Sequence, residues 1–168
     1  TTTGTFSLAG FNLDSGGFGD GNTQIDGLHY VTRDMTAGGF VLQKGDLLFS
    51  TASGETIGGV AYERHDIVRF RPTTPGNYSA GTFSLFFDRS DFDVDITAFT
   101  LVEQSVTVGN VTLNAGDLLF ADAGRDILRF VPTSYGSTTA GASSVLIDDA
   151  GVAISQNIAA IEVIERTT

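Results

Sequence analysis

The 168-residue sequence contains no cysteine and no tryptophan, and it has a single lysine and only 3 prolines. The lack of cysteine excludes disulfide bonds, thiol catalysis and cysteine-ligated zinc sites. The lack of tryptophan removes the largest side chain for stacking on sugar rings and leaves four tyrosines as candidates. Two of them, Tyr78 and Tyr135, follow strand-like segments, so they are the candidate platform for a carbohydrate.

Positive charge is also scarce. The sequence has 9 Lys and Arg against 20 Asp and Glu, which gives a net charge of −11 and a pI near 4.2. Such a chain repels phosphate backbones and anionic lipids, so nucleic-acid binding is excluded and membrane-surface binding is disfavoured. Because no apolar run approaches the roughly 20 residues that span a bilayer, we also expect no membrane insertion.

Sequence signatures of catalysis are missing. Only His29 and His65 could act as bases near neutral pH, and they stand far apart in the sequence. There is no G-x-S-x-G elbow, no H-E-x-x-H motif and no glycine loop of the kind that binds phosphate. The sequence therefore predicts a protein that is not an enzyme.

An internal repeat is the strongest positive signal. Four pairs of segments match in the same order along the chain: 41–50 with 112–121, 64–72 with 125–132, 80–88 with 140–148, and 96–103 with 158–165. Fainter relatives of the last two pairs lie at 4–8 and 25–32. We interpret the chain as one domain of about two and a half copies, at approximately residues 4–80, 81–140 and 141–168.

The repeated segments are short, rich in Phe, Ile, Val, Leu and Thr, and bounded by Gly, Asp, Asn or Pro, which is typical of strands. Residues 106–113 alternate around Gly109-Asn110 as in a β-hairpin. Residues 151–166 match the strand-like segment 96–103, so we predict that both are strands. Ten or more strands without helices between them predict an all-β fold, an antiparallel β-sandwich, with propeller-blade-like sheets as the alternative.

The repeat also resembles a known type. GDLLF, then an acidic turn before DILRFVPT, then TFSLFFDRSD, is similar to the Asp-rich β-repeats of large secreted bacterial surface proteins, over roughly residues 41–165. Those repeats are functionally uncharacterised modules, so the resemblance implies an extracellular or cell-surface location and no activity. The acidic stretch is shortened in the third copy and replaced by a glycine-rich loop in the first, so its role need not be repeated in every copy.

The densest acidic cluster is the candidate metal site. Asp91, Asp93 and Asp95 project to one side of an extended chain, with Asp88 just before them. Calcium is the candidate cofactor, since it is a hard cation that prefers oxygen ligands, although the spacing is not that of an EF-hand. The alternative is a solvated acidic edge that discourages aggregation between strands.

Other acidic residues have simpler interpretations. The glycine-rich segment from Asp14 to Asp26 offers oxygen ligands too, and we interpret it as a surface loop. In both copies an aspartate stands beside the start of each repeated strand, and we expect these residues to cap turns with their side-chain oxygens: Asp46, Asp66, Asp117 and Asp126.

Together these features favour a secreted, non-catalytic structural protein, a subunit of an extracellular filament or surface assembly. The first residue is Thr1 with no initiator methionine, which we interpret as the start of a processed, exported chain. Copies are expected to self-associate head to tail by strand addition, with Thr5–Phe11 or Ile158–Arg166 as the donated strand. The alternative is a calcium-dependent adhesion module or a carbohydrate-binding module of a bacterial surface protein.

Overall fold

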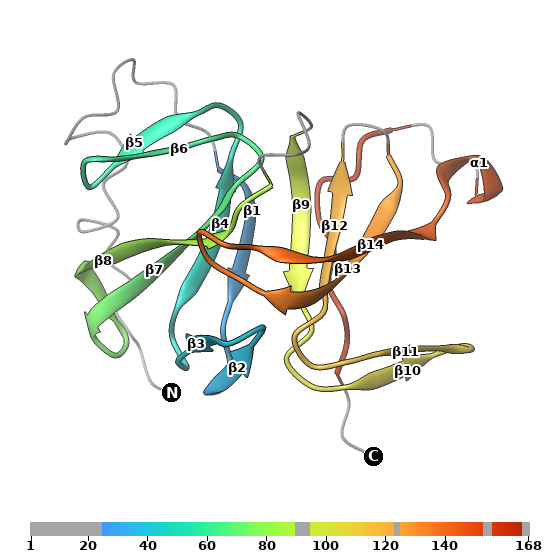
Figure 1. Cartoon of the computed structure of the whole chain (residues 1–168), viewed down its shortest axis with the longest axis horizontal. Coiled ribbons are helices and arrows are strands. Elements are labelled where there is room, and N and C mark those ends of the chain that lie inside the picture. Colours follow the sequence, from blue (N-terminus) through green and yellow to red (C-terminus); the bar gives the residue numbers. More distant parts are fainter. Residues whose placement is uncertain (1–24, 90–94, 123–124, 153–155, 166–168) are drawn as a thin grey trace, which may run out of the picture.

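Fourteen strands and one helical turn form the part of the chain that the structure describes, which is residues 25–89, 95–122, 125–152 and 156–165 of a computed structural model (Figure 1). The strands form two four-stranded antiparallel sheets and three two-stranded hairpins, which confirms the all-β, sandwich-like prediction. Within these residues, no helix is both long and apolar enough to cross a membrane.

The first sheet contains β1 (Ile25–Tyr30), β4 (Leu47–Thr51), β7 (Ile67–Thr74) and β8 (Asn77–Phe87), in that order. Each strand pairs with the next in an antiparallel meander. Two hairpins interrupt the meander, and their strands are β2 (Met35–Ala37) with β3 (Phe40–Leu42), and β5 (Glu55–Ile57) with β6 (Val60–Tyr62).

The second sheet repeats this order with β9 (Ile96–Leu101), β12 (Leu118–Asp122), β13 (Ile127–Ser134) and β14 (Ala140–Ile147). The hairpin of β10 (Val106–Val108) and β11 (Val111–Leu113) matches β2–β3 and confirms the turn predicted at Gly109-Asn110. Among the described residues of the second copy no hairpin corresponds to β5–β6, and the first copy holds 11 more residues between the matching segments at this point.

The two sheets agree in register as well as in order. Leu47 pairs with Phe70 in the first sheet, and Leu118 pairs with Phe130 in the second. Irregularities of the ladder fall at the same places, between Ile67 and Val68 in one copy and between Ile127 and Leu128 in the other. Matching sequence segments thus occupy matching positions. Each sheet begins with a 96–103-type segment, whereas the approximate boundaries predicted at 81 and 141 fall inside β8 and β14, because a repeat has no fixed starting point in sequence.

Two matched glycines allow the third and fourth strands of each sheet to approach closely. A Cβ on Gly81 would lie 2.4 Å from the carbonyl oxygen of Arg71 and 2.4 Å from the ring of Phe70. A Cβ on Gly141 would lie 2.4 Å from the carbonyl oxygen of Val131. These contacts explain why both copies have glycine where a β-branched residue would otherwise suit a strand.

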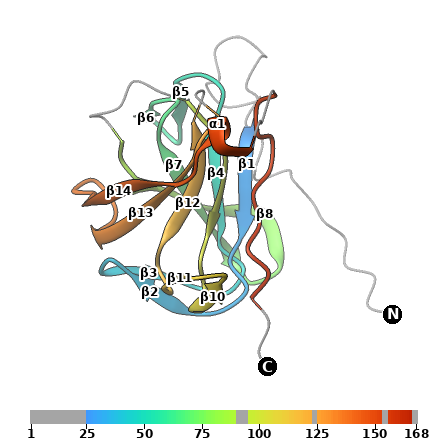
Figure 2. The same cartoon turned by 90° about the vertical axis from the view of Figure 1, so that its right-hand side faces the viewer.

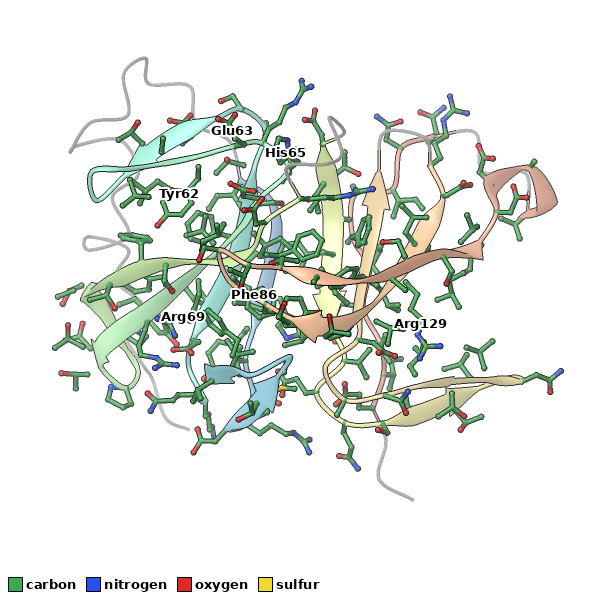
Figure 3. All side chains as sticks on the ribbon, in the orientation of Figure 1. Tyr62, Glu63, His65, Arg69, Phe86 and Arg129 are labelled. Carbon is green, nitrogen blue, oxygen red and sulfur yellow. The ribbon has the colours of Figure 1, made fainter. Side chains whose placement is uncertain are left out.

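The sheets pack against each other through one apolar layer, the central core. The first sheet contributes Leu48, Ile67 and Phe86, and the second contributes Phe120 and Phe130. Figure 3 shows Phe86 between the two sheets, and its ring stacks on that of Tyr135 at a centroid distance of 4.3 Å. Face-to-face packing of inward side chains is what sandwich-like sheets require.

The opposite face of the first sheet is covered by the extra hairpin, β5–β6. Ile57 and Tyr62 of the hairpin are 2% and 4% exposed, and they pack on a cluster that includes Phe49 and Phe70. Figure 3 shows Tyr62 beneath the hairpin, toward the first sheet. We call the face of the first sheet that lies under β5–β6 the head face. The face of the second sheet that points away from the first sheet is the tail face.

The strand predicted over residues 151–166 is wrong. A single helical turn, α1 (Asp149–Val152), includes its first two residues, and residues 156–165 run beside the first strands of the two sheets without joining a ladder (Figure 2). The segment is held by side chains instead, as where the Thr97 hydroxyl donates to the carbonyl of Ile158 at 3.1 Å. β1 and β9 are strands because β4 and β12 pair with them, and the described residues include no third copy of that partner strand.

Candidate functional site

The predicted calcium cluster lies only partly within the described residues, because Asp91 and Asp93 fall outside them. The carboxylate of Asp95 forms an ion pair with Arg64 at 3.0 Å, and the backbone amide of Asp88 donates to the Thr139 hydroxyl at 3.0 Å. The calcium site therefore stays a prediction. The acidic loop predicted from Asp14 likewise lies outside the described residues, up to β1.

Asp26, at the end of that loop, lies in β1. Burial raises the pKa of Asp26, and the nearby charge of Asp95 raises it further. The first strand of the first sheet thus brings a second carboxylate toward Asp95.

The turn-capping prediction is confirmed for Asp46, Asp66 and Asp117. Asp46 accepts the backbone N–H of Gln43 at 2.9 Å, and its counterpart Asp117 accepts that of Asn114 at 2.7 Å. Each buried carboxylate also pairs with an arginine, at 2.7 Å in the first copy (Arg71) and 2.6 Å in the second (Arg129). Asp66 accepts the N–H of Glu63 at 2.9 Å in the same manner. These aspartates are engaged in holding turns and an arginine to the sheet.

A different acidic group comes together at the far end of the second sheet. The carboxylates of Asp126, Asp148 and Asp149 lie within 4.8 Å of one another. Asp126 accepts the backbone N–H of Asp149 at 2.9 Å, and Asp148 accepts that of Ala150 at 2.9 Å. These hydrogen bonds account for the positions of Asp126 and Asp148 as caps of the α1 turn.

A groove of about 520 Å³ runs between β1, β9 and the C-terminal segment, and it contains a histidine–glutamate pair. His29 Nε2 lies 3.2 Å from Glu103 Oε1, and His29 Nδ1 lies 3.3 Å from the Thr100 hydroxyl. The Thr32 backbone N–H donates to Glu103 Oε1 at 2.7 Å, and the Thr32 hydroxyl donates to Oε2. Residues of the two sheets, more than 70 apart in sequence, thus share one hydrogen-bond network.

The electrostatics of this pair suit a structural role. The side chain of Glu103 is 3% exposed, and burial by itself raises its pKa. Hydrogen bonds from His29 and Thr32 outweigh burial, so the pKa of Glu103 lies below its ordinary value and the carboxylate is charged at neutral pH. Both ring nitrogens and both carboxylate oxygens have partners within the chain. His65, the second predicted base, does not line the groove.

The same contact recurs one copy further along the chain. Glu165 Oε1 accepts the backbone N–H of Glu103 at 2.5 Å, as Glu103 Oε1 accepts that of Thr32 at 2.7 Å. Thr32, Glu103 and Glu165 occupy the same place in the three copies of the repeated segment. Sequence reasoning missed the contact, although the alignment of 96–103 with 158–165 contained both glutamates.

An apolar groove of about 340 Å³ opens on the tail face. Leu113, Leu119, Ile127 and Leu146 line it, together with Ile161, Val163 and other residues of the C-terminal segment. Large apolar side chains around it remain exposed, and they are Val108 (58%), Val111 (37%), Ile147 (38%) and Ile164 (67%). The described residues leave this face much less covered than the head face.

The tyrosine platform predicted for carbohydrate is wrong. Tyr78 and Tyr135 are buried, and their hydroxyls donate to the carbonyls of Gly45 at 3.0 Å and Gly116 at 2.9 Å. Burial is the main cause that raises the pKa of Tyr78 to about 12, and burial also raises that of Tyr135. The two residues hold matching turns of the two copies, Tyr78 from the start of β8 and Tyr135 from the residue that follows β13.

Comparisons with protein-family models, curated proteins and solved structures found no match.

Proposed function

We propose that this chain is a non-catalytic structural module that builds an extracellular surface assembly by stacking four-stranded sheets of one repeat. The observation that carries the proposal is the copy-to-copy contact, in which Glu103 of the second copy and Glu165 of the third each accept the backbone N–H of the matching residue in the copy before. Because the same contact joins each copy to the next, further copies of the repeat can stack in one direction.

The histidine–glutamate network supports a structural role over a catalytic one. A general base must reach a substrate proton, and both partners here are engaged with each other and with threonines. The extracellular location rests on the resemblance to repeats of secreted surface proteins. The net charge of −11 fits a module that must stay soluble until it is assembled.

The two ends of the stack differ, which gives the assembly a polarity. The head face is covered by β5–β6, and the tail face carries the apolar groove. Strand donation by residues 158–166 is disfavoured, since Ile161 and Val163 already pack on their own chain. Thr5–Phe11, the other predicted donor, lies outside the described residues. We therefore propose that copies associate head to tail by stacking of sheets.

Stacking between identical copies requires the β5–β6 hairpin to leave the head face. Exposing the buried side chains of Ile57 and Tyr62 costs about 1.5–3 kcal/mol each, or about 3–6 kcal/mol together. That cost weakens association by about two to four orders of magnitude. The hairpin is thus expected to restrain assembly.

Sedimentation velocity and electron microscopy over a concentration series test the proposal. A shortened variant, in which Asp-Ala replaces residues 51–63 as in the second copy, is expected to form extended particles at lower concentration than the full chain. Val111→Asp in the tail groove is expected to abolish association in both backgrounds. The matched control Val41→Asp places the same charge at an exposed valine of the first copy and is expected to have no effect.

Monomers at every concentration for both the full and the shortened chain would contradict the assembly proposal. The same series in a chelator distinguishes the calcium-dependent alternative. Stacking through apolar faces is expected to be indifferent to the chelator, and loss of association on calcium removal would favour an adhesion module instead.

A further inference from the structure

We infer that the tail groove is the docking site for a further four-stranded sheet of the same repeat, one that has no hairpin over its docking face. The inference deepens the proposed stacking function and rests on it. It names which surface of the chain receives the next unit and which face of that unit covers it.

The apolar cluster on the tail face, the tail cluster, is a partial copy of the central core. Its buried members are Val102, Leu113 and Leu119, with Val106, Ile127, Leu146, Ile161 and Val163 packed against them. Their repeat counterparts are Val31, Leu42, Leu48, Met35, Ile67, Phe86, Phe99 and Leu101, and every one of these belongs to or packs against the central core. The second sheet therefore presents to the tail the same face that the first sheet presents to it.

At the tail, only the counterpart of the first strand of a covering sheet is present among the described residues. In the central core the second sheet contributes its first strand and also Leu118, Phe120 and Phe130 from the next two. At the tail, Ile161 and Val163 take the place of the first strand. No residue in the described ranges takes the place of Leu118, Phe120 or Phe130.

The exposed fractions of matching residues show how much of the covering sheet is missing at the tail. Ile147 is 38% exposed, whereas its counterpart Phe87 is 2% exposed beneath the rings of Phe120 and Phe130. In Figure 1 the second sheet lies beside the first, and β14 runs from the middle of the molecule toward α1. The internal interface thus specifies an occupant of known chemistry: a Leu-x-Phe strand followed by a strand with an inward phenylalanine.

The head face of the first sheet indicates which kind of sheet can dock on the tail groove. The face of the first sheet that would match this occupant carries Leu47, Phe49 and Phe70, and the β5–β6 hairpin lies over it. A sheet shaped like the second one, with a short connection in place of the hairpin, can dock without rearrangement. The occupant is therefore a copy of the repeat that, like the second sheet, has a short connection in place of the β5–β6 hairpin.

The experiment supplies such a sheet from the protein's own sequence. Residues 104–147 are added directly after Glu165 of the full chain, because Glu165 is the counterpart of Glu103. The chain has no cysteine, so Ile147→Cys introduces a single thiol at the edge of the groove. Its rate of labelling by a water-soluble maleimide reports whether the groove is covered.

The thiol introduced by Ile147→Cys is expected to react readily in the parent chain and at least about tenfold more slowly in the extended chain, since labelling then needs the added sheet to open. A matched thiol at an exposed site of the first copy, Val41→Cys, is expected to react at equal rates in both. Changing the added copies of Phe120 and Phe130 to aspartate is expected to restore fast labelling at position 147. Circular dichroism reports whether the added residues form strands.

Three results would overturn the inference. Equal labelling of Ile147→Cys in the parent and extended chains would show that the added sheet leaves the groove open, whether it folds elsewhere or stays unfolded. Slow labelling already in the parent chain would show that another part of the chain occupies the groove. Protection that survives both aspartate substitutions would show that the apolar face is not what docks. Self-association of the unextended chain is a separate readout, so its failure would contradict the proposed function and leave this docking result standing.

Discussion

Replacement of Glu103 by alanine removes the carboxylate that joins the first copy of the repeat to the second. The substitution deletes the acceptor of the Thr32 backbone N–H at 2.7 Å, of the Thr32 hydroxyl, and of His29 Nε2 at 3.2 Å. Hydrogen bonds to a charged group contribute about 1.5–3 kcal/mol each, and water can replace part of the bonding because Thr32 is exposed. We expect the free energy of unfolding to fall by about 2–3 kcal/mol, which lowers Tm by about 4–12 °C.

The pH dependence of this loss has a definite sign. Burial raises the pKa of Glu103, but the hydrogen bonds from His29 and Thr32 lower it by more, so the folded-state value lies below 4.5. A depressed carboxyl pKa contributes stability that is fully present above the unfolded value and is lost as pH falls through the folded value. The stability difference between wild type and Glu103→Gln is therefore expected to be full above pH 4.5 and to shrink as the pH falls below it.

Denaturant unfolding at neutral pH and at several acidic pH values measures both effects. Glu165→Ala is the matched control, since it removes a single bond at the equivalent place. Because Glu165 is only half-buried and water can replace part of that bond, the loss of stability is expected to be smaller, about 1 kcal/mol. If Glu103→Ala were as stable as wild type, or if the gap to Glu103→Gln stayed constant through the acid range, the contact between copies would not stabilise the stack as reasoned.

Three further predictions concern the packing between the two sheets and within each copy of the repeat. Phe87→Ala removes a ring that contacts Phe120, Phe130 and Tyr135 and is expected to lower the free energy of unfolding by about 3–5 kcal/mol in denaturant titrations, whereas a loss below about 1 kcal/mol would contradict the central core. Gly81→Ala and Gly141→Ala are expected to lower Tm markedly, because each new Cβ would meet a carbonyl oxygen at 2.4 Å. The control Gly151→Ala should leave Tm unchanged, because a Cβ at that position has no neighbour within 4 Å. Equal changes of Tm at the three sites would refute the close approach of the strands. Tyr78→Phe is expected to lower the free energy of unfolding at neutral pH by about 1 kcal/mol, because the hydrogen bond from the Tyr78 hydroxyl to Gly45 is lost. The folded-state pKa of Tyr78, about 12, lies above the unfolded value of 10.0, so the stability that Tyr78 contributes is present below pH 10 and is lost as the pH rises toward 12. Unfolding measured at increasingly alkaline pH should therefore show the stability of Tyr78→Phe converging on that of wild type.

Local pattern was enough to predict much of the fold. The alternation around Gly109-Asn110 predicts β10–β11, and matching segments occupy matching registers in both sheets. The turn-capping role of Asp46 and Asp117 also follows from their place before a repeated strand. These features depend on neighbours in sequence or on the repeat itself.

The errors arose where structure depends on partners distant in sequence. Residues 158–165 look like a strand, but a strand needs a neighbour to pair with, and the described residues hold no third copy of β12. Tyr78 and Tyr135 look like loop residues in the sequence, yet Tyr78 belongs to β8 and Tyr135 follows β13 directly, and both hydroxyls reach inward to Gly45 and Gly116. The β5–β6 hairpin over the head face has no counterpart among the described residues of the second copy, so comparison of the two copies could not reveal it.

The pairing of Glu103 with His29 illustrates the same limit. Neither residue belongs to a local motif, and the contact exists only when one copy lies beside the next in a fixed register. The signal that could have found it was the recurrence of glutamate at the end of 96–103 and 158–165.

Amide hydrogen exchange at Thr32 and Glu103, followed by NMR in the full chain, tests most directly whether successive copies are joined by the same contact. We expect Glu103→Ala to speed exchange at the Thr32 amide and to leave exchange at the amide of residue 103 slow. We expect Glu165→Ala to speed exchange at the Glu103 amide and to leave exchange at the Thr32 amide slow. Exchange at both amides that is unchanged by removal of either carboxylate would contradict this expectation.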